Sequence, residues 1–118
     1  EEHDMDRIVQ TDIEFHELLY QAARNQRLLL IIGNLREQLT RFRTISMSYP
    51  GRLKATLEEH RAIVDAIGSG DARLARKVGA KHMEHSEQTL LYAIEEHEKK
   101  TGTSLIKRKS KKSKGDPE

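Results

Sequence analysis

Apolar residues recur every three or four positions along most of the 118-residue chain, which is the spacing of a helix with one buried face. No stretch shows the period-two alternation of a half-buried strand. Four segments carry the helical spacing, over about residues 4–24, 27–47, 52–67 and 72–98. The sequence therefore predicts an all-α fold of four helices. The short connections between them predict antiparallel packing in a bundle.

Turn-forming residues mark where these helices end. Pro50 interrupts the helical spacing after the second segment. Gly68 and Gly70 close the third segment, and Asp71 stands where an N-cap residue should begin the fourth. We therefore expect a single helical domain over residues 1–98.

The last twenty residues differ in composition from this domain. Residues 99–118 contain eight Lys/Arg and two acidic residues, so they carry most of the basic character of a chain whose net charge is +2. Such a charged, low-complexity segment cannot bury enough apolar surface to fold. We expect a basic, disordered tail over residues 99–118, and we favour a solvating role for it over a contact with nucleic acid.

The core-facing row of each helix can be read from the three-four spacing of a bundle seam. The rows are Met5, Ile8, Asp12, Phe15, Leu19 and Ala22; Leu28, Ile32, Leu35, Leu39 and Phe42; Leu53, Leu57, His60, Val64 and Ile67; and Ala75, Val78, His82, His85, Thr89 and Tyr92. The second row is apolar throughout. The other three are interrupted by Asp12, His60, His82 and His85, which are unusual residues for a buried face.

The spacing of these polar residues predicts that they meet. Asp12 and His16 are four residues apart, so they share one face of the first helix. His60 and His82 each lie eleven residues from Asp71, at the turn between the third and fourth helices. In an antiparallel hairpin both would lie about 16 Å from that turn, at the same level. The first helix would bring Asp12 and His16 to the same layer.

A carboxylate and three imidazoles buried together are costly unless something compensates them. A divalent cation does so, because it uses the carboxylate charge and the lone pairs of neutral imidazoles. The ligand set of Asp12, His16, His60 and His82 suits Zn²⁺ first, with Ni²⁺, Mn²⁺ or Fe²⁺ as alternatives. Coordination positions left open could take water or a small carboxylate. A set of hydrogen-bonded core histidines in a metal-free dimerisation module remains the competing interpretation.

Several neighbouring residues extend this hypothesis. His85 competes with His82 for a ligand position, and the symmetry about the turn favours His82, with His85 beside it. Arg36, Arg41 and Arg43 are interpreted as a solvated face, although one of them could bind an anion next to the metal.

A metalloenzyme would also need a general base that is not a ligand. The candidates are Glu14, Glu58, Glu59 and Glu84, of which Glu14 and Glu58 point away from the seam.

The amino-acid composition narrows the classes of protein to which this chain can belong. The chain has no cysteine, which excludes disulfides and thiolate chemistry and favours a cytoplasmic protein. No apolar run approaches the roughly 20 residues of a membrane span. The content of 36% hydrophobic and 34% charged residues is typical of a helical, water-soluble domain.

Longer stretches of the sequence resemble a known family. "DIEFHELLYQAARNQRLLLIIGNL" and "SYPGRLKATLEEHRAIVDAIGSGDARLARKVGAKHMEH" contain D-x-x-x-H, A-A-x-N, E-H-x-x-I-x-x-A-I and G-D, with a His eleven residues past that Asp. Over about residues 5–95 this combination resembles FCD, the C-terminal effector-binding domain of the FadR subfamily of GntR-type bacterial transcription regulators. The resemblance implies an all-helical bundle that dimerises, binds a small organic acid and is not an enzyme. It also implies a divalent metal on Asp12, His16, His60 and His82.

The resemblance also implies parts that these 118 residues do not contain. Family members carry an N-terminal winged helix-turn-helix that binds operator DNA, and one or two helices before the D-x-x-x-H helix. We therefore expect an N-terminally incomplete effector domain that is part of a larger bundle. It would form a homodimer and contact DNA only through the absent domain.

Overall fold

The computed structural model describes residues 2–104, and its side-chain detail begins at Asp4. The described residues form helices and connections, without a strand, so the predicted all-α class is confirmed. The elements are α1 (Glu2–Ala22), α2 (Gln26–Asn34), α3 (Arg36–Met47), α4 (Arg52–Gly68) and α5 (Ala72–Thr101). The prediction of four helices is wrong, because these residues contain five.

The additional helix comes from a break inside the predicted segment 27–47. The amide of Leu35 donates to the carbonyl of Ile32 at 3.0 Å, a tight turn that ends α2 before α3 begins. Gly33 and Asn34 lie inside this turn, and both are poor helix formers. The apolar spacing runs through the break unchanged, so the pattern alone did not reveal it.

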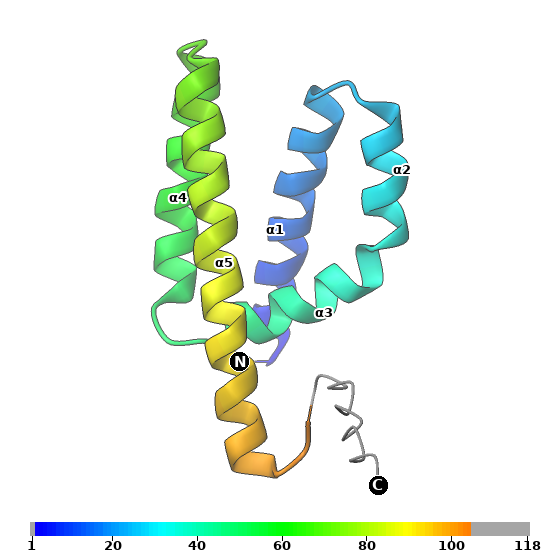
Figure 1. The fold of residues 1–118 in the computed structure, drawn as a ribbon, viewed down its shortest axis with the longest axis vertical. Coiled ribbons are helices and arrows are strands. Elements are labelled where there is room, and N and C mark those ends of the chain that lie inside the picture. Colours follow the sequence, from blue (N-terminus) through cyan, green and yellow to red (C-terminus); the bar gives the residue numbers. More distant parts are fainter. Residues whose placement is uncertain (1, 105–118) are drawn as a thin grey trace, which may run out of the picture.

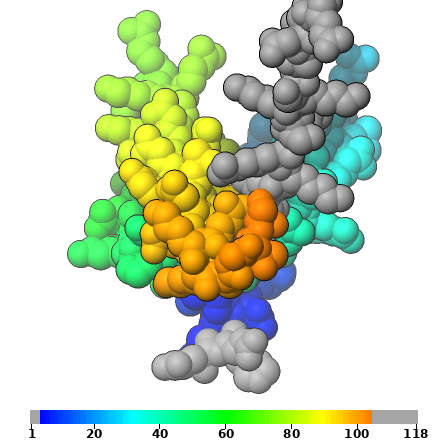
Figure 2. Space-filling model, turned by 60° about the horizontal axis from the view of Figure 1, so that its bottom comes forward, coloured from blue at the N-terminus to red at the C-terminus, as the bar shows by residue number. Residues whose placement is uncertain are grey.

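The hairpin of α4 and α5 is the longest part of the architecture (Figure 1). The two helices run antiparallel and pack closely against each other. On the other side of the molecule, α2 runs back beside α1, and α3 then crosses obliquely to reach α5. In Figure 2 the last turns of α5 stand between the beginning of α4 and the helices α2 and α3. Because α3 packs against both α1 and α5, it connects the two halves.

Local chemistry explains the boundaries around the hairpin. The side chain of Asp71 accepts a hydrogen bond from the amide of Leu74 at 2.9 Å, so the predicted N-cap is confirmed. At the other end α5 continues to Thr101, where Gly102 takes a left-handed conformation with a φ of 65°. Residues 99–101 are therefore helical, and residues 105–118, which hold most of the predicted tail, lie outside the described residues.

The core-facing row of α4 differs from the predicted one. The residues that α4 buries are Arg52, Thr56, Ile63 and Ala66. Each precedes by one position a member of the predicted row Leu53, Leu57, Val64 and Ile67. In the structure Leu57, Val64 and Ile67 are at least half exposed. This part of the seam prediction is wrong because α4 has apolar residues on two adjacent faces. Packing in the folded domain buries the face that carries Ile63 and Ala66.

The other face of α4 borders an open groove. Leu57 and Val64 line it from α4, and Ile8 and Phe15 line it from α1, around a volume of about 760 Å³. Leu28, Leu35 and Tyr92, which were expected in the core, are also exposed. The apolar core is consequently small. Its buried members among the described residues are Val9, Ile13, Met47, Ile63, Ala66 and Ile94.

No helix within residues 2–104 has both the length and the apolar character that crossing a bilayer requires.

Replacement of Asp71 by Ala should destabilise the hairpin. It removes the acceptor for the Leu74 amide at the start of α5, and loss of an N-cap typically costs about 1 kcal/mol. Asp71→Asn keeps an acceptor and should stay within a few tenths of a kcal/mol of the wild type. Chemical denaturation followed by circular dichroism would measure both variants. Equal stability of the two variants would contradict the capping role.

Candidate metal centre

Three histidines from three helices converge between α1 and the α4–α5 hairpin. They are His16 on α1, His60 on α4 and His82 on α5, and one ring nitrogen from each lies within 4.8 Å of the others. The Nε2 atoms of His60 and His82 are 3.3 Å apart. The sequence-based expectation that these two residues face each other at one level of the hairpin is therefore confirmed.

Hydrogen bonds fix which nitrogen each ring can offer. Nδ1 of His16 lies 2.7 Å from the backbone carbonyl oxygen of Asp12, and Nδ1 of His82 lies 2.5 Å from Oε2 of Glu59. A carbonyl and an ionised carboxylate only accept hydrogen bonds, so Nδ1 must carry the proton in both rings. Nε2 is then the nitrogen with a free lone pair in each neutral ring, as metal ligation requires.

The surroundings of His60 and His82 favour neutral rings. His16 and His82 are buried, and the side chain of His60 is only 12% exposed. Burial lowers the pKa of His60 to about 4, helped by the nearby His16 and His82. Burial also lowers the pKa of His82, although the hydrogen bond from its ring to Glu59 acts in the opposite direction. At neutral pH these two imidazoles are therefore uncharged.

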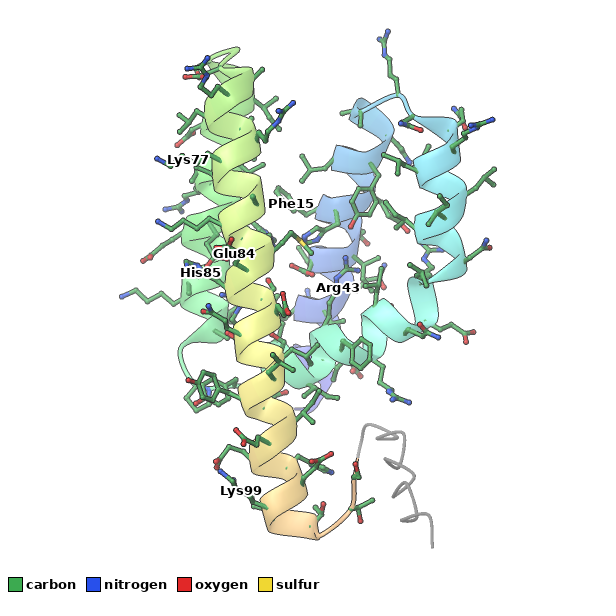
Figure 3. All side chains as sticks on the ribbon, in the orientation of Figure 1. Phe15, Arg43, Lys77, Glu84, His85 and Lys99 are labelled. Carbon is green, nitrogen blue, oxygen red and sulfur yellow. The ribbon has the colours of Figure 1, made fainter. Side chains whose placement is uncertain are left out.

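Aromatic contacts hold the rings in place from the α1 side. Phe15 stacks on His60 with 4.0 Å between ring centroids and an interplanar angle of 14°. It also meets His16 edge to face at 5.4 Å. Figure 3 shows Phe15 between α1 and the hairpin. Since Phe15 touches histidines on two different helices, it fixes the spacing between them.

Asp12 lies beside the three histidines and faces two kinds of partner. Its Oδ1 is 3.7 Å from Nε2 of His60, and its Oδ2 is 3.1 Å from Nε of Arg43. Burial raises the pKa of Asp12, but the hydrogen bond to His16 and the electrostatic interactions with His16, Arg43 and His60 outweigh it and leave the pKa lowered. The buried carboxylate is therefore held ionised.

Arg43 does not belong to a solvated face, in contrast to the sequence-based interpretation. Its side chain, which is labelled in Figure 3, is 18% exposed and reaches Asp12 from α3. The other two arginines of that group remain largely at the surface. Arg36 forms an ion pair with Glu17, and Arg41 lies over the ring of Phe42. The break at Leu35 gives α3 its own direction, and this direction brings Arg43 to the site.

Glu59 connects the centre to a second group of residues. It accepts hydrogen bonds from both guanidinium Nη atoms of Arg52, at 3.1 and 2.8 Å, and Oε1 lies 2.8 Å from Nδ1 of His85. His85 is 43% exposed and is not among the three converging histidines, so the choice of His82 over His85 agrees with the geometry.

Sequence reasoning considered Glu59 only as a general base, and it did not consider Arg52. The one available signal was that Glu59 immediately precedes His60. Arg52 gave no signal, because an arginine in the first turn of a helix is usually solvated.

A cavity of about 320 Å³ adjoins the histidines and is bordered by α1, α3, α4 and α5. Asp12, His16, His82 and Arg43 contribute to its wall. Thr56 also lines it, and its Oγ1 is a buried side-chain oxygen that finds no hydrogen-bond partner within the described part of the chain.

Comparison with protein families matches residues 1–85 to the FCD domain, which is the larger part of the chain. The chain belongs to the FCD domain family. No curated protein and no solved structure matches it. FCD domains are the effector-binding modules of GntR-type transcription regulators, which are not enzymes. The matched region covers α1 to α4 and α5 as far as His85, so it includes all four residues that the sequence predicted as ligands.

The donor set of this FCD domain fits a divalent cation. Imidazole nitrogens and an ionised carboxylate are the ligands that zinc and related first-row metals prefer. The three histidines are brought together by the structure, and Asp12 lies next to them as the candidate fourth ligand.

The metal-free FCD domain should lose stability as the pH falls from 6.5 towards 4. The folded state lowers the pKa of His60 from 6.5 to about 4, so the unfolded chain binds a proton that the folded chain excludes. For His60 alone this corresponds to a loss on the order of 2–3 kcal/mol. Urea denaturation at several pH values in EDTA would measure it. His60→Asn should flatten the profile, and the exposed His97→Asn should not. Parallel profiles for the two variants would contradict the assignment.

Proposed function

We propose that this FCD domain is the sensing and dimerisation module of a cytoplasmic GntR-type regulator. In this proposal Asp12, His16, His60 and His82 hold a divalent metal, and a small carboxylate effector binds beside it. The observation that carries the proposal is the convergence of three imidazole nitrogens within 4.8 Å at the centre of the helices.

A metal explains the centre better than hydrogen bonds alone. With Nδ1 of His82 protonated, its Nε2 carries a lone pair directed at His60, and only one shared proton could close that 3.3 Å contact. His16 offers a third lone pair to the same space, for which the described residues provide no donor. A cation satisfies all three lone pairs at once. Zn²⁺ is the first candidate, and Ni²⁺, Mn²⁺ and Fe²⁺ are the alternatives.

The cavity next to the histidines supports an anionic effector. Arg52 is unsuited to bind it, because its two Nη atoms are engaged by Glu59 and Ser86. Arg43 lines the cavity with a partly exposed side chain. A guanidinium beside a metal with open positions suits a carboxylate. The volume of about 320 Å³ fits a small organic acid.

Effector binding would act on the packing of the helices that line the cavity. Arg43 belongs to α3, which connects α1 to the hairpin, so a ligand on Arg43 bears on both halves of the domain. In the proposed homodimer this change would alter the placement of winged helix-turn-helix domains, which these 118 residues do not include. The family membership supports this role.

The metalloenzyme alternative gains no support from the site. It requires a free carboxylate base near the metal. Glu59 is the nearest of the candidates, but Arg52, His82 and His85 occupy its oxygens and lower its pKa to about 2 against the effect of its burial. Glu14, Glu58 and Glu84 are exposed.

Protein purified without chelator should contain close to one equivalent of metal by elemental analysis. Zn²⁺ at 100 times its Kd should then stabilise the fold by about 2.7 kcal/mol, measured as a rise in Tm over the EDTA-treated protein. Asp12→Ala and His60→Ala should remove most of this rise. His85→Ala serves as the matched control, because His85 is near the site but outside the cluster.

A metal content at background would contradict the metal centre. Together with melting temperatures that EDTA leaves unchanged in the wild type, Asp12→Ala and His60→Ala, it would favour the metal-free dimerisation module instead.

Zn²⁺-loaded protein should bind at least one member of a panel of mono- and dicarboxylic acids with two to six carbons. Arg43→Gln should weaken that binding about 10-fold or more, since hydrogen bonds to charged groups contribute about 1.5–3 kcal/mol. Arg41→Gln is the matched control, because Arg41 lies at the surface over Phe42. Calorimetric titration would give the affinities. Equal affinities for the two variants would contradict the role of Arg43, and the uncharged amides of the same acids should not bind.

A further inference from the structure

Glu59 has more partners than a structural salt bridge needs. Its two carboxylate oxygens meet Arg52 twice, His82 once and His85 once. Its side chain is 16% exposed, and it approaches His82 from the side away from His60. The function proposed above assigns no role to this carboxylate.

The contact with His82 fixes both the proton and the orientation of that ring. A carboxylate accepts but does not donate, so the proton of His82 must reside on Nδ1. The ring is then held at one nitrogen and presents the other, Nε2, to His60 at 3.3 Å. A carboxylate behind a metal-binding imidazole also raises the basicity of the nitrogen that binds the metal.

Arg52 keeps Glu59 in this position. It is 5% exposed and makes a two-pronged hydrogen bond to the carboxylate, which supplies geometry as well as a compensating charge. One of the same Nη atoms donates to Oγ of Ser86 at 2.9 Å, so the guanidinium is anchored to α5 as well as to α4. Glu59 therefore cannot follow the His82 ring if that ring rotates.

We propose that Glu59, held by Arg52, is a positioning residue that selects Nε2 of His82 as the ligand nitrogen and sets the metal affinity of the site. This inference rests on the proposed metal centre. It is distinct from a role in joining α4 to α5, because a purely structural contact would change stability and leave the affinity for metal unchanged.

Metal affinity in matched variants separates the two roles. The Kd for Zn²⁺ would be measured by competition with a chromophoric chelator, for variants whose helical content by circular dichroism equals that of the wild type. Glu59→Ala should raise the Kd about 10- to 100-fold. Glu59→Gln keeps an acceptor for His82 but loses the charge, so its Kd should fall between those of the wild type and Glu59→Ala.

Two controls test the specificity of this effect. Glu58→Ala makes the same change at the exposed neighbouring position, and His85→Ala removes the other histidine that touches Glu59. Both should stay within about two-fold of the wild type. The Co²⁺-loaded protein gives a second readout, because its visible absorption should change in Glu59→Ala and remain unchanged in both controls.

The tautomer of His82 can be read without any variant at this carboxylate. Long-range nitrogen–proton NMR of the ¹⁵N-labelled, metal-free wild type should show the proton of His82 on Nδ1, with His82→Asn used to assign the signal. A proton on Nε2 would overturn the inference, even if no Glu59 variant folds. Zn²⁺ affinities of Glu59→Ala equal to those of Glu58→Ala would also overturn it. A wild type that binds no metal would instead overturn the metal centre, and this inference with it.

Discussion

The burial of three imidazoles and a carboxylate between α1 and the α4–α5 hairpin is the constraint on which the rest of this domain depends. The apolar core is too small to dominate the interior, and the polar residues occupy its middle level. Such groups are tolerated only when each has a partner or a ligand. Here the partners lie on the side of each group that faces away from the centre of the cluster. The carbonyl of Asp12 pairs with His16, the carboxylate of Glu59 with His82, and the guanidinium of Arg43 with the carboxylate of Asp12. The inner side presents lone pairs that suit a cation.

The partners of the site come from different helices, and this links the site to the architecture. Arg43 belongs to α3, and Arg52 ties α4 to Ser86 on α5. Side chains therefore connect α1 to α3 and α4 to α5 through the residues that surround the histidines. A ligand that changes the position of Arg43 would act on the helix that joins the two halves. This arrangement gives a physical route from an occupied cavity to a change in helix packing.

The sequence predicted the convergence of His16, His60 and His82 more accurately than it predicted the packing around them. The symmetry of His60 and His82 about Asp71 depends only on helix rise and an antiparallel turn, and both are local properties. The core-facing row of α4 was wrong by one position, because an isolated helix with apolar residues on two faces does not indicate which face meets α5. The break at Leu35 was missed because the apolar spacing continues across it. The contact of Glu59 with His82 and the role of Arg52 were missed because a charged residue in a helix is usually solvated, and their burial depends on contacts across the hairpin.

The sequence by itself determined the all-α class, the hairpin turn at Asp71 and the alignment of Asp12, His16, His60 and His82. These follow from helical periodicity and from the conformational preferences of glycine and the N-cap, which act over a few residues. Only the tertiary structure decided which face of α4 is buried, that Arg43 reaches Asp12 and that Glu59 orients His82. Those outcomes depend on how helices distant in sequence approach one another, and the approach is set by side-chain size and charge on both partners at once.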